Sequence, residues 1–203
     1  GVLDEPVWQR AALLTGFSQF SPSDGVPAAD STEVLVWYSP GAIHFGIRAF
    51  EAHGAVHATL ADRDRIGADD HIQILLSTFG DGRQATVFAV TPLGVQSDGA
   101  LVETGAVRSG NGFSGAVVRR DVADLSPDYD FDSKVRVTGG GYEIEIRIRF
   151  KSIRYQSAAE QSWGLNVTRR VQHSGYEDSW TPARLASASF LAQSGKLVGL
   201  TDL

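Results

Sequence analysis

The sequence of 203 residues contains no cysteine and no methionine. The absence of cysteine excludes disulfides and thiolate metal sites, but it leaves the compartment open because many exported proteins also lack this residue. No apolar run approaches the roughly 18 residues that a membrane-spanning helix needs. No basic run is longer than a pair, and the net charge is −6, so the basic character that is usual in nucleic-acid binders is missing.

The short motifs of several enzyme classes are also missing. The chain has no G-x-S-x-G, no P-loop, no G-x-G-x-x-G and no H-E-x-x-H. His53 and His57 are four residues apart, but no glutamate follows His53, and both are interpreted as surface residues. Glu143 and Glu145 lie on one face of a predicted strand, where a glycosidase would place carboxylates roughly 5–10 Å apart. They alternate with arginines, which favours cross-strand ion pairs.

What the sequence does contain is a clear strand signal at Gly141–Tyr155. Apolar and charged residues alternate from Tyr142 to Phe150, and this period of two is typical of a strand with one buried face. Such a strand needs paired neighbours and a second apolar layer.

Several other segments are predicted as partner strands, separated by Gly- and Pro-containing turns. They are residues 33–38, 42–51, 56–60, 70–78, 83–91, 95–107, 115–121, 134–138 and 163–171. With no long amphipathic helix, about ten strands predict an all-β fold, an antiparallel β-sandwich of jelly-roll type. We expect residues 1–203 to form one domain with an entry segment at 1–30 and a tail at 187–203.

Two groups of aspartates are candidate sites for a hard cation such as calcium, which prefers six to eight oxygen ligands. The first comprises Asp62, Asp64, Asp69 and Asp70, and the second comprises Asp128, Asp130 and Asp132. The alternative for both is a solvated acidic loop.

Loop aromatics are the remaining signal, because sugars stack their apolar faces on Trp or Tyr. Trp180 and Tyr129, the latter with Phe131, are the candidates.

The order of weak motifs along the chain resembles a bacterial protein family. In that family a domain similar to the family-nine carbohydrate-binding modules precedes a C-terminal outer-membrane β-barrel. The motifs cover nearly the whole chain: W-x-x-A (Trp8 to Ala11), F-x-Q-x-x-P-x-x-G (Phe17 to Gly25), T-E-V (Thr32 to Val34), Arg63-Asp64, D-x-I-x-I-x-L (Asp70 to Leu76), F-x-D-x-R (Phe79 to Arg83), F-x-V-x-P-x-G-V-Q-x-D (Phe88 to Asp98), Gly141 to Tyr155, W-G-x-N-x-x-R (Trp163 to Arg169) and W-x-P (Trp180 to Pro182).

The resemblance implies a β-sandwich, export to the periplasm or cell surface, and a tail that leads into a missing C-terminal region. The start GVLDEP, which lacks Met, also leads us to expect a processed or trimmed sequence. The chain departs from the family at Arg149, where Pro is usual, and at Gln73, where sugar-binding members carry Glu. We find no second Trp in the loop 62–70. Haem-binding relatives use Met and His, so the absence of Met sets haem aside.

Three hypotheses follow. The first is a non-catalytic glycan-binding domain of a larger exported outer-membrane protein. Its predicted sugar-binding residues are Trp180, Gln73, Arg63, Asn166, Arg169 and Tyr129. The second is a structural or protein-interaction domain that has lost sugar binding, which the missing Glu and Trp favour. The third is part of a glycan hydrolase. The predicted partners are a glycan or polysaccharide and the protein's own outer-membrane barrel, and the candidate metal is calcium.

Overall fold

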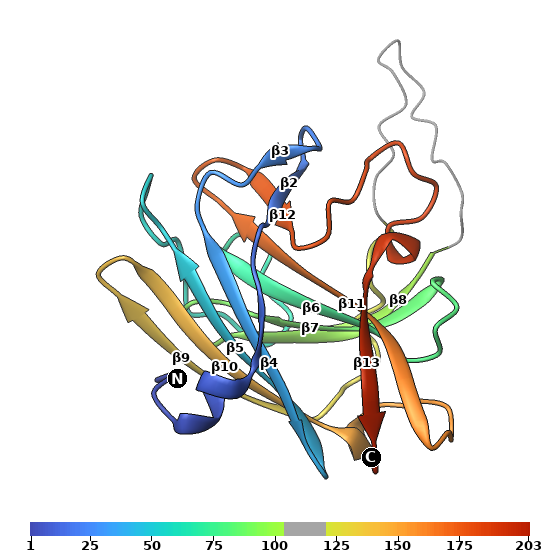
Figure 1. Ribbon diagram of the computed structural model, residues 1–203. Helices are drawn as coiled ribbons and strands as arrows, with labels where there is room; N and C mark the ends of the chain where they lie inside the picture. Colours follow the sequence, from blue (N-terminus) through green and yellow to red (C-terminus); the bar gives the residue numbers. More distant parts are fainter. Residues whose placement is uncertain (104–120) are drawn as a thin grey trace.

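The computed structural model describes residues 1–103 and 121–203 and forms two antiparallel sheets packed face to face (Figure 1). The five-stranded sheet has the order β1 (Ala12–Leu14), β4 (Thr32–Ser39), β5 (Ala42–Phe50), β10 (Gly141–Arg149) and β9 (Phe131–Thr138). The eight-stranded sheet has the order β3 (Val26–Pro27), β2 (Ser18–Ser21), β12 (Tyr176–Ser179), β11 (Glu160–Val171), β6 (His71–Ser77), β7 (Gln84–Val90) and β8 (Gln96–Val102), with β13 (Gly195–Thr201) also paired to β11. Short 3₁₀ helices occupy Pro6–Arg10, Phe150–Ser152 and Leu191–Gln193.

The predicted all-β sandwich is therefore confirmed, with thirteen strands among the described residues instead of about ten. The additional strands are mostly short ones at or next to the sheet edges, such as β1, β2 and β3, whose two to four residues give little periodicity to detect. In residues 1–103 and 121–203, no helix is long and apolar enough to cross a membrane. The glycine-rich loop predicted at 109–115 and most of the strand predicted at 115–121 lie outside the described residues.

Strand β10 lies between β5 and the edge strand β9 in the five-stranded sheet. Its inward residues Ile144, Ile146 and Ile148 are fully buried. They pack in one cluster with inward residues of the other sheet, among them Ile74 and Val167. The apolar residues of the alternating pattern thus form part of the core that both sheets share.

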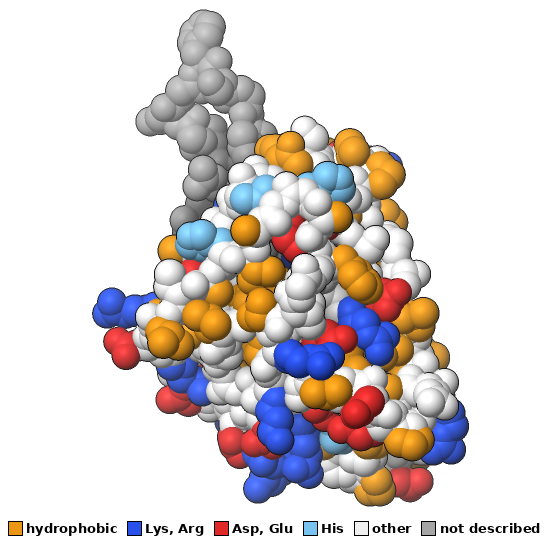
Figure 2. All heavy atoms as spheres, turned by 90° about the vertical axis from the view of Figure 1, so that its left-hand side faces the viewer, with side chains coloured by type: hydrophobic (Ala, Val, Ile, Leu, Met, Phe, Trp, Pro, Cys, Tyr) orange, Lys and Arg blue, Asp and Glu red, His pale blue; other side chains and the backbone are white. Residues whose placement is uncertain are grey.

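The outer face of β10 carries the predicted ion pairs. The register places Glu33, Arg48, Glu143 and Arg136 side by side on four neighbouring strands. Arg48 lies 3.4 Å from Glu33 and 3.5 Å from Glu143, and Arg136 lies 2.5 Å from Glu143. Figure 2 shows acidic and basic side chains interspersed over the lower part of one face of the molecule. The structure confirms the prediction of cross-strand ion pairs at Glu143.

One predicted strand is wrong. Residues 56–60 form no strand, and Leu60 is 85% exposed. The backbone of this stretch is instead tied to the start of β6. The His57 amide donates to the Asp70 carboxylate at 2.7 Å, and the Asp70 amide donates to the His57 carbonyl at 2.9 Å.

Candidate functional site

A groove of about 800 Å³ lies over the outer face of the eight-stranded sheet. Strands β6, β7 and β8 form its floor, β2, β11 and β12 supply one side, and residues 121–125 supply the other. In Figure 1, β2 and β12 lie above and to one side of β6 and β7. We refer to this hollow as the outer groove.

The floor of the outer groove is apolar. Leu75 on β6 is paired with Val87 on β7, and Leu101 on β8 and Phe20 on β2 join them. All four are less than 9% exposed and belong to a second apolar cluster, separate from the core between the sheets. The run Ile74-Leu75-Leu76 explains this arrangement, because consecutive apolar residues place apolar side chains on both faces of a strand.

A polar row crosses the sheet beside this floor. The register aligns Thr168 on β11 with Gln73 on β6, Ala89 on β7 and Ser97 on β8. Paired residues in antiparallel strands point to the same face, so Gln73 and Ser97 both project into the outer groove. The hydroxyl of Thr168 lies 3.5 Å from the Gln73 side-chain oxygen.

Two residues of opposite charge lie at the same end of the outer groove. Arg170 on β11 is directly opposite Glu177 on β12, and both line the hollow. Phe20 is the single aromatic residue among the described lining residues, and its ring is buried against Phe190 at a centroid distance of 4.8 Å. The described part of the groove therefore combines an apolar floor with a polar end but has no exposed Trp or Tyr.

The wall at residues 121–125 is attached to the free edge of β8. Ala100 and Asp124 exchange two backbone hydrogen bonds of 2.9 and 2.8 Å. Gly99 makes this approach possible, because a Cβ at that position would overlap the Asp124 carbonyl oxygen.

The structure brings only Gln73, of the six predicted sugar-binding residues, into the outer groove. Trp180 follows β12 and packs against the core between the sheets, with Gly195 beside its ring. A Cβ at Gly195 would lie 2.5 Å from that ring. Trp180 is thus only partly exposed and lies outside the outer groove, and its role as a stacking platform stays a prediction.

Asn166 and Arg169 lie on opposite faces of β11. Asn166 is fully buried, and its side-chain oxygen accepts hydrogen bonds from the Val167 amide at 2.9 Å and the Thr181 amide at 3.2 Å. These bonds fix the chain that leaves β12. Arg169 is 1% exposed and points between the sheets, where it contacts Glu51 at 3.0 Å. Neither residue is placed to bind a ligand in the outer groove.

Arg63 and Tyr129 meet at the far edge of the sandwich. The Arg63 guanidinium forms an ion pair with Asp98 and donates to the Tyr129 carbonyl at 3.2 Å. The Tyr129 ring packs edge-on against Phe88 at 5.9 Å and borders a second hollow of about 680 Å³. These contacts connect residues 128–131 to the core.

The four predicted metal-binding aspartates have separate partners. Asp69 accepts from the Thr59 hydroxyl at 3.0 Å, Asp70 accepts from the amides of His57 and Gln172 at 2.7 Å, and Asp64 accepts from the Asp98 amide at 3.3 Å. The Asp62 backbone carbonyl accepts a hydrogen bond from the Arg65 amide at 3.2 Å. Within residues 1–103 and 121–203, these aspartates do not form a group of three or more ligands within 4.8 Å. Calcium here stays a prediction.

Sequence reasoning missed a buried polar group around Arg169. Asp178, opposite Arg169 in the register, is 3% exposed, and burial raises its pKa to about 6. Burial also raises the pKa of Glu51, although Arg169 acts in the opposite direction. The Tyr142 ring lies 5.8 Å from the Arg169 guanidinium, and burial raises the pKa of its hydroxyl. An arginine at an inward position of a strand was the available signal, because buried charges need partners.

No family model and no curated protein matched this chain. Among solved structures, a family 9 carbohydrate-binding module from Caldicellulosiruptor kristjanssonii in complex with cellotriose aligns with a TM-score of 0.63 and 11% identity, over 98% of this chain and 88% of that one. A complex of the same kind of module with glucose aligns with a TM-score of 0.64 and 11% identity, over 98% of this chain and 90% of that one. The chain shares the fold of the family 9 carbohydrate-binding modules. A proposed carbohydrate-binding protein from Bacteroides uniformis aligns with a TM-score of 0.63 and 16% identity, over 94% and 87%.

Proposed function

We propose that this chain is a non-catalytic carbohydrate-binding domain whose ligand lies in the outer groove. The observation that carries the proposal is the apolar floor beside a polar row, on a fold shared with modules solved in complex with glucose and cellotriose. A sugar ring presents apolar C–H faces and polar edges, so a site needs both kinds of surface.

The groove supplies these surfaces from different strands. Leu75 and Val87 are nearly buried and would lie beneath the ring, whereas Leu125, which is 44% exposed, would contact its C–H face. Gln73 and Ser97 would hydrogen-bond its hydroxyls, and Arg170 would do so at the charged end. Because these residues project from paired strands, the site is rigid before the ligand arrives.

Titration calorimetry with cello-, xylo- and chito-oligosaccharides tests the proposal. Loss of one hydrogen bond in Gln73→Ala should weaken binding about 2- to 12-fold, which corresponds to about 0.5–1.5 kcal/mol. Gln156→Ala is the matched control, because Gln156 is exposed and lies outside the groove. No binding at millimolar ligand, or an equal loss in the control, would refute it.

The alternative is a structural or interaction domain that has lost sugar binding. It is favoured by one observation, the absence of Trp and Tyr among the described groove residues. Under this alternative the oligosaccharides would produce no chemical-shift changes at Gln73 or Ser97.

A hydrolase acting through Glu143 and Glu145 receives no support. Glu143 forms ion pairs with Arg48 and Arg136, and both carboxylates lie on the outer face of the other sheet.

We also propose that the domain works as part of a larger exported outer-membrane protein. The support is the order of motifs from Trp8 to Pro182, which resembles the family described above. Immunodetection of the native protein in fractionated cells tests this proposal. Recovery in the outer-membrane fraction is expected, and recovery in the cytoplasm would contradict it.

A further inference from the structure

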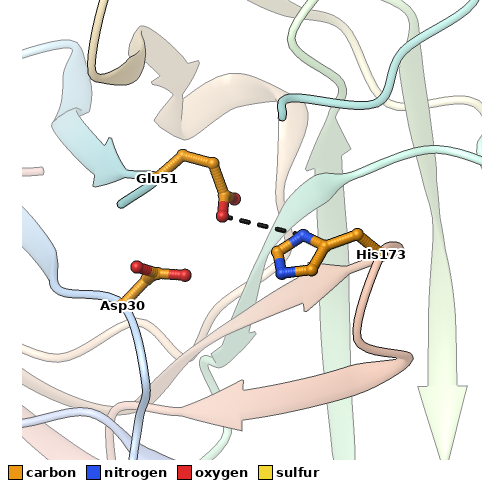
Figure 3. A group of neighbouring side chains, drawn as sticks. All are labelled: Asp30, Glu51 and His173. Carbon is orange, nitrogen blue, oxygen red and sulfur yellow. Dashed lines mark ion pairs between the residues drawn. The ribbon is translucent and has the colours of Figure 1, made fainter. Parts of the chain in front are cut away.

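A second group of potential ligands lies at one end of the sandwich, between the two sheets. Asp30 precedes β4, Glu51 follows β5, and His173 lies in the turn between β11 and β12 (Figure 3). One potential ligand atom from each residue lies within 4.8 Å of the others. It is the only such group among the described residues.

The Glu51 carboxylate points into the centre of this group. Its side chain is 2% exposed, and its Oε2 atom accepts from Arg169 at 3.0 Å. Its other oxygen, Oε1, is buried without a hydrogen-bond partner and faces the His173 Nδ1 atom at 3.6 Å. Figure 3 shows this oxygen directed at the His173 ring, with the Asp30 carboxylate beside it. A buried carboxylate oxygen without a partner is costly unless an ion or water completes it.

The surrounding residues reinforce this observation. Seven described side-chain atoms are buried without a hydrogen-bond partner. One of them is the Nε atom of the Arg169 guanidinium, and three more belong to its neighbours Glu51, Tyr142 and Asp178. The Asp30 Oδ1 atom accepts from the Ala52 amide at 2.9 Å and contacts the His53 Nδ1 atom at 2.7 Å. These two bonds orient Asp30, and outer partners of this kind are typical of metal ligands.

We infer that Asp30, Glu51 and His173 bind a divalent transition metal of the zinc class. This site is independent of the proposed sugar groove. One imidazole nitrogen and two carboxylate oxygens match the ligands of Zn²⁺, with bonds of about 2.0–2.2 Å. A tetrahedral site then places ligand atoms roughly 3.3–3.6 Å apart, which is the spacing between Glu51 and His173. Calcium fits less well, because it prefers oxygen ligands alone.

The group can accept an ion from solvent and can adjust to it. The His173 side chain is 31% exposed and lies in a turn, so it can move toward the carboxylates. Gly54 leaves room for the imidazole, since a Cβ there would lie 2.7 Å from the ring. Figure 2 shows histidine side chains at the surface near the top of one face. A bound ion would link the two sheets at an end without strand pairing between them.

The test is a zinc titration of tag-free protein stripped with a chelator, followed by calorimetry. The expected result is one ion per chain. His173→Ala and Asp30→Asn should each weaken binding at least about tenfold. His57→Ala is the matched control, because His57 is a 56%-exposed histidine outside the group, and it should leave the affinity unchanged.

A measurement on the unmutated protein avoids any dependence on variant folding. Zinc should shift the His173 imidazole nitrogen signals more than those of His57, and cobalt should give the absorption of a four-coordinate site. Absence of binding at millimolar zinc would overturn the inference and leave buried water as the occupant. Equal binding by wild type and His173→Ala would overturn it as well. Neither outcome bears on oligosaccharide binding.

Discussion

Gly99→Ala should detach one wall of the outer groove. Gly99 lies on β8, and a Cβ there would overlap the Asp124 carbonyl oxygen, which belongs to the backbone and cannot rotate away. The segment 121–125 must therefore move off the edge of β8. The pairing of Gly99 with Val87 on the other side of the strand is unaffected.

The magnitude follows from the bonds that are lost. Ala100 and Asp124 share two backbone hydrogen bonds, and each contributes about 0.5–1.5 kcal/mol to stability. Replacing glycine by alanine also reduces the conformational entropy of the unfolded chain, which stabilises the folded state by about 0.4–1 kcal/mol. The expected net loss lies between about 0 and 2.6 kcal/mol of unfolding free energy.

Urea unfolding and amide hydrogen exchange check this prediction. The amides of Ala100 and Asp124 should exchange much faster in the variant, whereas amides between β7 and β8 should keep their protection. Gly139→Ala is the matched control, because a Cβ there meets no atom within 4 Å. Unchanged exchange at Ala100 and Asp124, with stability equal to the control, would refute the reasoning.

Two further predictions concern the five-stranded sheet. Ile146→Ala should lower the free energy of unfolding by about 2–5 kcal/mol, because it leaves a cavity at a fully buried position. Val137→Ala, at a 50%-exposed position, should change it by less than about 0.5 kcal/mol, and similar losses in urea unfolding would contradict the assigned core. Burial, assisted by Arg147, lowers the pKa of His44 below its ordinary value of about 6.5. The folded state then binds fewer protons, so this residue's contribution to stability is present above about pH 6.5 and is lost as the pH falls through the lower folded pKa. An NMR titration that gives His44 a pKa at or above about 6.5 would contradict this.

The core of the fold was predictable from the sequence because its signals are local. The alternation in β10 identifies the buried face without knowledge of its neighbours, and the charges between the apolar residues predict ion pairs of the kind found at Glu143. The sequence also carries a signal for the apolar floor of the outer groove. Leu75 interrupts the alternation of β6, which indicates that both faces of this strand are covered.

The site residues were harder to predict because their surroundings come from distant parts of the chain. Trp180 stands among polar residues and beside Pro182, as an exposed loop residue would. The short strand β12 precedes it and turns it inward against the core. Asp30, Glu51 and His173 belong to three separate loops, and only the packing of the two sheets brings them together.

Strands β11 and β12 connect the two proposed sites. Arg170 and Glu177 face the outer groove, whereas their neighbours Arg169 and Asp178 face the buried polar group, because successive residues of a strand point to opposite faces. His173 lies in the turn that joins these strands. Gln73→Ala and His173→Ala change opposite faces of the same sheet, so the two activities can be separated.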